Sequence, residues 1–161
     1  MTHVPWIGRT MKTPDELRGA EEFFHTKIPL TRAMGVRVVC DDERRFVVTA
    51  PVALNYNHLH TAFGGSINAV AMLAGYGLLW MQLRGEAAHV VIAESSIRFL
   101  QPVRETIRAI CARPDAHELE TFHSTLRAKS KAKIALHVRV EEDGKVAAEL
   151  VATFVALRDA G

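Results

Sequence analysis

The chain has 161 residues, of which 48% are hydrophobic and 24% are charged, and its formal net charge at pH 7 is only +2. This length suits one domain with a substantial core, and so small a charge argues against nucleic acid or a membrane surface as a partner. The two cysteines, Cys40 and Cys111, stand far apart in apolar stretches. We therefore expect free thiols in a reducing, cytoplasmic compartment instead of a disulfide framework.

Residues 1–12 contain no apolar block long enough for a signal peptide, so we expect a flexible tail followed by a single domain over residues 13–161. The domain opens on a helix start, in which Thr13 is the N-cap, Pro14 the first helical residue and Glu16 the closing residue of a capping box. The elements predicted next are the end of that helix near residues 28–29, strands over residues 36–40 and 45–50, and an irregular segment over residues 51–62.

A long helix is predicted from about residue 65 to residue 83, inside a stretch that has no Asp, Glu, Lys or Arg after Arg45 and before Arg84. About 20 apolar residues are enough to cross a membrane. This stretch, however, contains four glycines and several polar residues, and it lacks a basic cluster on one flank and an aromatic belt at both ends. We therefore predict a helix that is apolar on all sides because the protein buries it in its own core.

The C-terminal half is predicted to consist mainly of strands. They are expected over residues 89–100, 106–112, 131–141 and 145–157, with a connection over residues 114–123 that has room for one helical turn. Asp143-Gly144 is a tight hairpin turn. The order of elements predicts an α+β hotdog fold, an antiparallel sheet wrapped around the apolar helix. Because the last strand is apolar on both faces, we expect a second subunit as cover, in a homodimer or a dimer of dimers.

Several short motifs carry a family resemblance. They are Ile28-Pro29-Leu30, Met34-Gly35-Val36, Ala50-Pro51, Asn55, Asn57, Thr61, Phe63-Gly64-Gly65-Ser66, Gly75-Tyr76-Gly77-Leu78-Leu79-Trp80, Glu94, Ile97-Arg98-Phe99 and Pro102-Val103. With these the chain resembles, over residues 17–158, the hotdog-fold thioesterase family of the YiiD C-terminal type. The resemblance implies an acyl-CoA thioesterase that needs no cofactor apart from the coenzyme A of its substrate and no metal.

The turn before the long helix is the first candidate for chemistry. Two glycines at a helix start allow a substrate to approach the backbone, and the free N–H groups point along the positive end of the helix dipole. The amide of Gly65, with Ser66 adjacent, is therefore a candidate for binding the oxyanion of a thioester reaction. The alternative is that Gly64 and Gly65 only form a sharp corner between loop and helix.

A candidate for positioning water comes from the resemblance. In the wider hotdog thioesterases an asparagine six residues before the turn orients the water or the carbonyl, and here that position is Asn57. The alternative is a loop asparagine that satisfies backbone groups. The sequence departs from the wider pattern at two positions, because Phe63 stands in place of a histidine and Met72 stands where those enzymes carry the acidic base.

A carboxylate must therefore come from elsewhere, and Glu94 is the candidate. Strict alternation along its strand predicts that Val90, Ile92, Glu94, Ser96 and Arg98 share one face. An acid buried among apolar neighbours is costly unless it has a purpose, and a buried carboxylate is suited to act as a general base. The alternative is an ion pair between Glu94 and Arg98.

The remaining candidates concern substrate binding. Asn68 and Tyr76 lie on one helical stripe with Met72 and supply hydrogen bonds or are satisfied in the core. His58 and His60 have a spacing seen in metal sites, but no third ligand is near in sequence. Basic residues from Arg127 to Lys133 face coenzyme A phosphates or protect a strand edge. The full candidate set is His58, His60, Thr61, Phe63, Gly64, Asn68, Tyr76, Ser96, Arg98, Lys129 and Lys131.

The working hypothesis is an acyl-CoA hydrolase at a subunit interface, in which Asn57 and Glu94 position a water and Gly65 binds the oxyanion. One alternative is a non-catalytic module that binds acyl-CoA or an acyl carrier. A hotdog dehydratase is the other, although that chemistry needs a histidine and an acid near the helix. No Gly-x-Ser-x-Gly elbow, phosphate loop or dinucleotide motif is present, so covalent serine catalysis is not supported.

Overall fold

The computed structural model describes residues 11–160, so most of the predicted tail over residues 1–12 lies outside the described residues. In chain order the elements are α1 (Pro14–Lys27), α2 (Leu30–Ala33), β1 (Arg37–Asp41), β2 (Arg45–Pro51), the 3-10 turn η1 (Val52–Leu54), α3 (Gly64–Gln82), β3 (Ala88–Phe99), β4 (Thr106–Ala112), α4 (Ala116–Lys129), β5 (Lys131–Glu142) and β6 (Lys145–Arg158).

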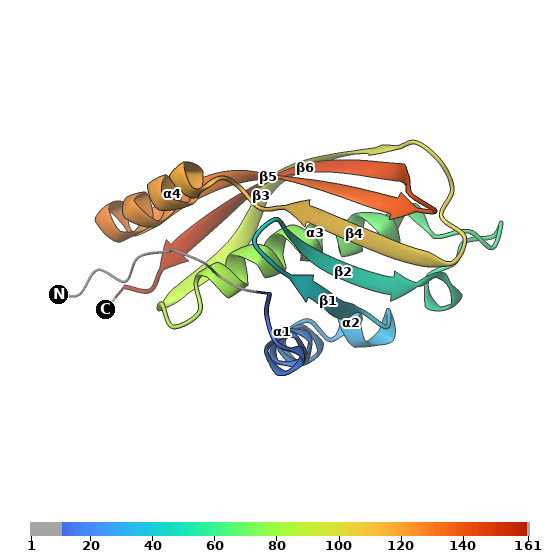
Figure 1. Cartoon of the computed structure of the whole chain (residues 1–161), viewed down its shortest axis with the longest axis horizontal. Helices are drawn as coiled ribbons and strands as arrows, with labels where there is room; N and C mark the ends of the chain where they lie inside the picture. The colour runs from blue at the N-terminus through green and yellow to red at the C-terminus, as the bar shows by residue number, and fades with distance from the viewer. Residues whose placement is uncertain (1–10, 161) are drawn as a thin grey trace.

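The strands form one antiparallel sheet in the order β1-β2-β4-β5-β6-β3. Figure 1 shows the sheet curving around α3, with α4 on the outer side of the curve. The predicted arrangement of a sheet wrapped around one apolar helix is therefore confirmed. No helix within residues 11–160 is long and apolar enough to cross a membrane.

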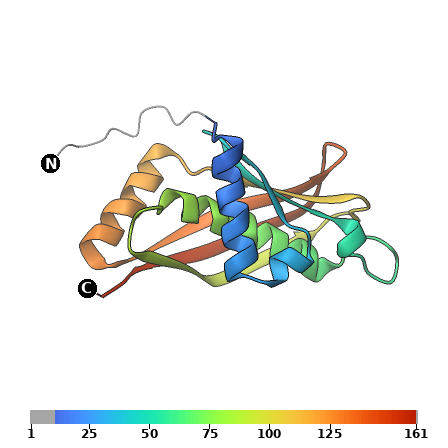
Figure 2. The same ribbon diagram turned by 90° about the horizontal axis from the view of Figure 1, so that it is seen from below.

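Helix α1 begins as predicted. The Thr13 side chain accepts a hydrogen bond from the backbone N–H of Glu16, and the Glu16 side chain accepts one from the N–H of Thr13. The helix runs across α3 (Figure 2) and buries Phe24 against it. The first turn of the domain is thus fixed by its own capping residues, and its apolar face is fixed by α3.

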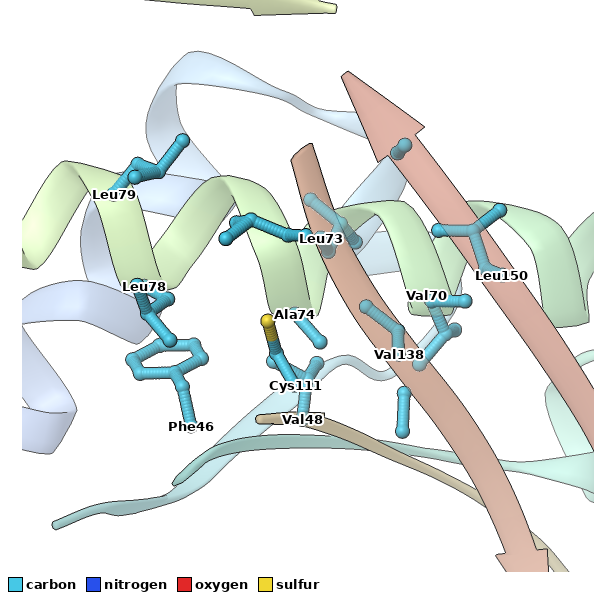
Figure 3. Close-up of a cluster of buried hydrophobic side chains, with 14 of the residues drawn as sticks. Phe46, Val48, Val70, Leu73, Ala74, Leu78, Leu79, Cys111, Val138 and Leu150 are labelled. Carbon is cyan, nitrogen blue, oxygen red and sulfur yellow. The ribbon is translucent and has the colours of Figure 1, made fainter. Parts of the chain in front are cut away.

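Helix α3 is buried on most of its circumference. Its side chains pack against β2, β4, β5 and β6, and Figure 3 shows Val70, Ala74 and Leu78 pointing toward these strands. A Cβ atom on Gly77 would lie 2.4 Å from the Phe46 ring, and one on Gly75 would lie 2.8 Å from the Phe154 ring. These glycines therefore let two aromatic rings of the sheet touch the helix backbone.

The predicted connection over residues 114–123 is wrong, because most of it belongs to α4. Asp115 caps this helix through the N–H of Glu118, and the helix ends at Lys129 before the C-cap Ser130, which has a left-handed φ of 57°. Its apolar side, which includes Phe122 and Leu126, packs on β5. The candidate Lys129 is therefore helical, whereas Lys131 begins β5.

A β-bulge in β3 changes which residues face the core. Ile92 is opposite Phe154, but after the bulge Glu94 is opposite Thr153 and Ser95 is opposite Ala152. Phe154 and Ala152 are buried on the inner face of β6. The residues of β3 that follow the bulge on this inner face are Ser95, Ile97 and Phe99, whereas Glu94, Ser96 and Arg98 face outward. The prediction that these three share a face with Val90 and Ile92 is therefore wrong.

Candidate functional site

The N-terminus of α3 is open to a ligand. Its N-cap, Phe63, provides no side-chain cap, and the N–H of Ile67 bonds the carbonyl of Phe63 at 3.0 Å. Within residues 11–160, none of the N–H groups of Gly64, Gly65 and Ser66 bonds a group outside α3 and its N-cap. Three amides therefore remain at the positive end of a 19-residue helix, which is an arrangement suited to bind a negative oxygen.

Two phenylalanine rings border these amides. A Cβ atom on Gly65 would lie 2.4 Å from the ring of Phe63, whereas one on Gly64 would lie 3.5 Å from the ring of Phe99. Both rings are more than half exposed in the single chain. The glycine at position 65 thus allows Phe63 to lie against the first turn, and the two rings form an apolar border around a polar backbone site.

Asn57 shapes the loop that leads to this turn. Its Oδ1 accepts hydrogen bonds from the N–H groups of Leu59 and Thr61, at 2.9 and 3.2 Å, and its Nδ2 donates one to Thr61 Oγ1 at 3.1 Å. His60 in the same loop has a positive φ of 59°. These contacts match the loop role that the sequence left open for Asn57, and they use only one of the two hydrogens on Nδ2.

Asn55 is a site-positioning residue that the sequence pattern did not distinguish from an ordinary turn asparagine. It is buried, and its Nδ2 donates to the carbonyls of Met34 and Pro51 at 2.9 and 2.8 Å. Its own carbonyl accepts the N–H of Phe63 at 2.7 Å. Asn55 therefore ties the start of α3 to the segment before β1 and to the last residue of β2.

The histidines of the loop are exposed. His60 stacks on Tyr56, with ring centroids 5.5 Å apart, and His58 lies near the loop tip. The loop projects at one end of the molecule (Figure 2). In the part of the chain that the structure describes, no three His, Cys, Asp or Glu side chains come together as metal ligands. The loop, which includes Thr61, lies next to the open N-terminus of α3 and borders the candidate site.

One stripe of α3 is not covered by the sheet. Asn68, Met72, Tyr76 and Trp80 are half-buried, every fourth residue, while the residues between them are mostly buried. Asn68 Oδ1 has no solvent exposure and no hydrogen-bond partner among residues 11–160. Burial raises the pKa of Tyr76. The stripe starts one turn from Gly65, so it continues the site along the helix.

The outward residues of β3 do not reach this stripe. Glu94, Ser96 and Arg98 are exposed on the far face of the sheet, and Arg98 lies 4.0 Å from Glu149, so the structure pairs it with that residue. The expected burial of Glu94 is therefore wrong, and so is its expected pairing with Arg98. The physical reason is the bulge between Ile92 and Glu94. After it, each side chain of β3 points to the face opposite to the one that strict alternation predicts.

The exposed candidates Lys129 and Lys131 lie at the other end of the sheet. Lys131 is opposite Leu157, close to the start of β3, whereas Phe99 at the end of β3 borders Gly64. The 12 residues of β3 separate these ends by more than 30 Å at about 3.3 Å per residue. Within one chain the two lysines are therefore far from the open helix end.

A groove of about 410 Å³ lies near that other end, between α1, α3 and the start of β3. Phe23 of α1 stacks on Trp80, with centroids 4.4 Å apart, and lies parallel to Tyr76. Arg84 lies over the Trp80 ring at 5.5 Å. The sequence signal for this groove is the pair of aromatic residues four apart on α3, but their partner Phe23 comes from a distant helix.

Comparison with known proteins identifies the family that this chain matches. Residues 17–158 match the family described as "Putative thioesterase (yiiD_Cterm)". A protein of unknown function from Chlorobaculum tepidum TLS superposes with a TM-score of 0.85 at 29% identity, over 91% of this chain and 98% of its own. A "putative thioesterase" from Shewanella oneidensis superposes with a TM-score of 0.81 at 30% identity, over 90% of this chain and 99% of its own.

More distant structures show the same fold. The Escherichia coli PaaI protein from a phenylacetic acid degradation operon superposes with a TM-score of 0.61 at 18% identity, over 93% of this chain and 98% of its own. At this identity the likeness concerns the architecture alone, which is that of the hotdog thioesterases. The match over almost the whole described domain shows that the chain belongs to the YiiD_C thioesterase family and has the hotdog fold.

Proposed function

We propose that the protein hydrolyses acyl thioesters, with acyl-CoA as substrate, at the N-terminus of α3. The observation that carries the proposal is the turn of Gly64, Gly65 and Ser66, whose amides bond no group outside α3 and its N-cap within residues 11–160. A thioester carbonyl becomes an oxyanion during hydrolysis. Preorganised N–H donors at a helix N-terminus stabilise such an oxygen without further rearrangement.

In this mechanism the carbonyl oxygen lies on the amide of Gly65, with the Ser66 hydroxyl beside it. A water held by the second hydrogen of Asn57 Nδ2 attacks the carbonyl carbon, and the Asn68 amide, whose Oδ1 is buried in the single chain, turns toward this water to accept its hydrogen bond. The carbon–sulfur bond then breaks, and the thiolate of coenzyme A leaves and takes up the proton that the water gave up. The products are a carboxylic acid and free coenzyme A. Glu94 has no part in this proposal, because it faces away from α3.

Asn68 supports the proposal in a specific way. Its Oδ1 is a buried acceptor with no partner among residues 11–160, and it lies one helical turn after Gly65. Buried polar atoms are almost always hydrogen-bonded, so an exception next to a candidate site suggests that a ligand or a water completes it. In this proposal Asn68 orients the attacking water, because α3 contains no acidic side chain that could do so.

The two edges of the sheet support a homodimer. The edge strand β1 is covered, because the N–H of Val38 bonds Glu21 Oε2 at 3.1 Å and the carbonyl of Asp41 accepts the N–H of Lys12 at 2.9 Å. Within residues 11–160, only β6 bonds the backbone of residues 89–99 in β3. A long open edge is a template for pairing, so we propose that two copies join through β3.

The same strand carries exposed apolar side chains, among them Val91 and Ile92, and Phe99 borders the site. A second copy would bury these groups and close the site from the side that the sheet leaves open. We also place the protein in the cytoplasm, where Cys40 and Cys111 remain as the free thiols of the structure.

The test is thiol release from a panel of acyl-CoA substrates by the full chain. We expect turnover in the wild type and in Glu94→Ala, and loss of turnover in Asn57→Ala, with circular dichroism as the control for folding. Absence of turnover on every thioester, by a folded dimer, would remove the proposal.

The second candidate is a module that binds acyl-CoA without hydrolysing it. It is favoured by α3 itself, which contains no Asp, Glu or His. Isothermal titration with a thioether analogue distinguishes the two functions when it is combined with the thiol assay. Binding without thiol release would establish the module in place of the enzyme.

A further inference from the structure

Phe63 and Phe99 border the amides of Gly64 and Gly65 on two sides. The edge of the Phe63 ring occupies the place that a Cβ atom on Gly65 would need, with Cζ 2.9 Å and Cδ1 3.2 Å from that position. A Cβ atom on Gly64 would lie 3.5 Å from Cζ of Phe99. In a helix the Cα–Cβ bonds tilt toward the N-terminus and turn by about 100° from one residue to the next. The two rings therefore lie beside the N-terminal end of α3, in directions about 100° apart around its axis.

The backbone that carries each ring is fixed by hydrogen bonds. The N–H of Phe63 donates to the carbonyl of Asn55 at 2.7 Å, and the carbonyl of Phe63 accepts the N–H of Ile67 at 3.0 Å. Phe99 is the last residue of β3 and is paired with Ala148 of β6. The attachment points of both rings are therefore in place before a substrate binds, as a site that selects substrates requires.

Simple bond geometry places the second carbon of an acyl group close to the Phe63 ring. A carbonyl oxygen that accepts a hydrogen bond from the Gly65 N–H lies about 2.9 Å from the nitrogen. The C=O bond adds about 1.2 Å and the next C–C bond about 1.5 Å. Because these bonds are angled, carbon 2 of the acyl group lies roughly 4–5 Å from the amide nitrogen. A ring at the Cβ position of the same residue is then within contact distance of carbon 2.

The polarity of the rings decides which half of the thioester lies against them. Phe63 and Phe99 are 56% and 54% exposed in the single chain, so both offer apolar surface to a ligand. The acyl half of a thioester is apolar, whereas the pantetheine arm on the sulfur carries amide groups that lose free energy when they are buried without hydrogen bonds. The acyl carbons therefore pack on the rings, and the sulfur lies on the side away from them.

From this geometry we infer that Phe63 is a specificity-determining residue, which together with Phe99 restricts the protein to acyl thioesters that are unbranched at carbon 2. A CH2 group at this carbon directs only hydrogens toward the ring. A methyl branch there needs space that the Phe63 ring occupies. One carbon more or less in an apolar site changes kcat/KM by roughly 10- to 200-fold. The inference rests on the proposed function, because it concerns the acyl group of the same substrate.

Two isomeric substrates test the role of Phe63. Butyryl-CoA and isobutyryl-CoA have the same number of carbons, but only isobutyryl-CoA is branched at carbon 2. We expect the wild type to prefer butyryl-CoA by at least about tenfold in kcat/KM. In Phe63→Ala this preference should fall to less than about twofold, mainly because kcat/KM for isobutyryl-CoA rises. A preference that stays at tenfold in Phe63→Ala would overturn the inference.

Two further variants separate the ring of Phe63 from general effects on the loop. Phe63→Tyr keeps a ring at this position and should keep the preference of the wild type. Tyr56→Ala removes another ring of the same loop, which is 59% exposed and stacks on His60, and it should keep the preference as well. Equal loss of preference in Tyr56→Ala would overturn the assignment to Phe63. Equal turnover of both substrates by the wild type would overturn the inference and leave hydrolysis standing.

Binding tests the same selection even if the protein hydrolyses nothing. S-(2-oxopentyl)-coenzyme A and S-(3-methyl-2-oxobutyl)-coenzyme A are isomeric ketones that keep a carbonyl for the α3 amides and have no thioester bond. In isothermal titration we expect the wild type to bind the straight-chain ketone at least about tenfold more tightly than the branched one. Phe63→Ala should bind the two with Kd values within about twofold of each other. Equal Kd values for the wild type would overturn the inference, whatever the thiol assay shows.

Discussion

Asn68 is a single residue that we expect to affect both the free energy of unfolding and the proposed hydrolysis. Its Oδ1 is buried without a hydrogen-bond partner among residues 11–160, and such an atom costs about 1–3 kcal/mol of folding free energy. Folded proteins keep costs of this kind mainly where a ligand or a water supplies the missing bond. Because Asn68 lies one turn from Gly65, we assign the missing hydrogen bond to the water or substrate of the proposed reaction.

Asn68→Leu should therefore stabilise the protein and inactivate it. The leucine has a similar size and no unsatisfied oxygen, so we expect the free energy of unfolding to rise by about 1 kcal/mol. Loss of the orienting acceptor should lower turnover about 100-fold. Urea unfolding and thiol release measure the two effects on the same preparation. A destabilised variant with normal turnover would show that Asn68 has only a structural role.

His123 makes stability depend on pH. It is a buried residue of α4, and burial lowers the pKa of His123 below its ordinary value of 6.5, while nearby Glu86 and Glu120 oppose this effect and Arg127 adds to it. Between the two pKa values the unfolded chain binds more protons than the folded chain. Stability is therefore complete above pH 6.5 and falls as the pH decreases below it, with a limiting slope of about 1.4 kcal/mol per pH unit.

His123→Gln should flatten this dependence, and chemical denaturation between pH 5 and pH 8 measures it. His117→Gln is the matched control, because it removes an exposed histidine from the same helix. An unchanged slope in His123→Gln would show that other groups cause the loss of stability in acid.

Single residues were predictable where the cause is local. The capping residues Thr13 and Glu16 act through neighbours in sequence, and so do the open amides at Gly65. The orientation of Glu94 was not predictable, because the bulge before it depends on how β3 pairs with β6. Periodicity assumes an uninterrupted strand, and one extra residue exchanges the two faces.

At the scale of elements, the glycines of α3 determine how closely the sheet packs on it. Gly77→Ala would place a Cβ atom 2.4 Å from the Phe46 ring, in a core where neither side can easily yield. We expect a loss of about 1–3 kcal/mol in the free energy of unfolding. Gly19→Ala on α1 is the matched control, because nothing lies within 4 Å of the added atom, and it should stabilise by about 0.5–1 kcal/mol. Thermal melts of both variants check the pair, and equal effects would contradict the close packing.

Most elements could be read from hydrophobic periodicity, because α3 is long and apolar and the strands alternate. Helix α4 was missed although its signals are present: Asp115 and Glu118 form a capping box, and Leu119, Phe122 and Leu126 lie on one side. The helix is short of apolar residues and stands between strands, so its pattern resembles a connection. Packing against β5 stabilises the helical conformation of this segment, and the sequence alone does not show that contact.

At the scale of the whole molecule, the outer face of the sheet was expected to need a second subunit as cover. Part of the cover is α4 of the same chain, which packs on β5 and reaches β6, where Val155 is buried. Val151 and Leu157 on the same face remain exposed. We therefore base the proposed dimer on the edge of β3 and not on this face.

A charge on the β3 edge should separate the subunits. Ile92 and Val39 are both 41% exposed and both lie on edge strands, so a lysine in either position has a similar cost within one chain. We expect Ile92→Lys to sediment as a monomer and Val39→Lys to sediment as the wild-type dimer. Dimers of both variants in analytical ultracentrifugation would exclude β3 as the interface.

The most direct measurement is thiol release from acyl-CoA by two proline variants. Proline fits the first turn of a helix and removes one backbone N–H, so Gly64→Pro and Gly65→Pro delete neighbouring amides. Gly65→Ala is the control for crowding, because it brings a Cβ atom to the same 2.4 Å from the Phe63 ring and keeps its N–H. We predict that Gly65→Pro loses at least about 100-fold in kcat and that Gly64→Pro retains most of its turnover. Equal turnover by the wild type and a folded Gly65→Pro dimer would contradict oxyanion binding at the start of α3.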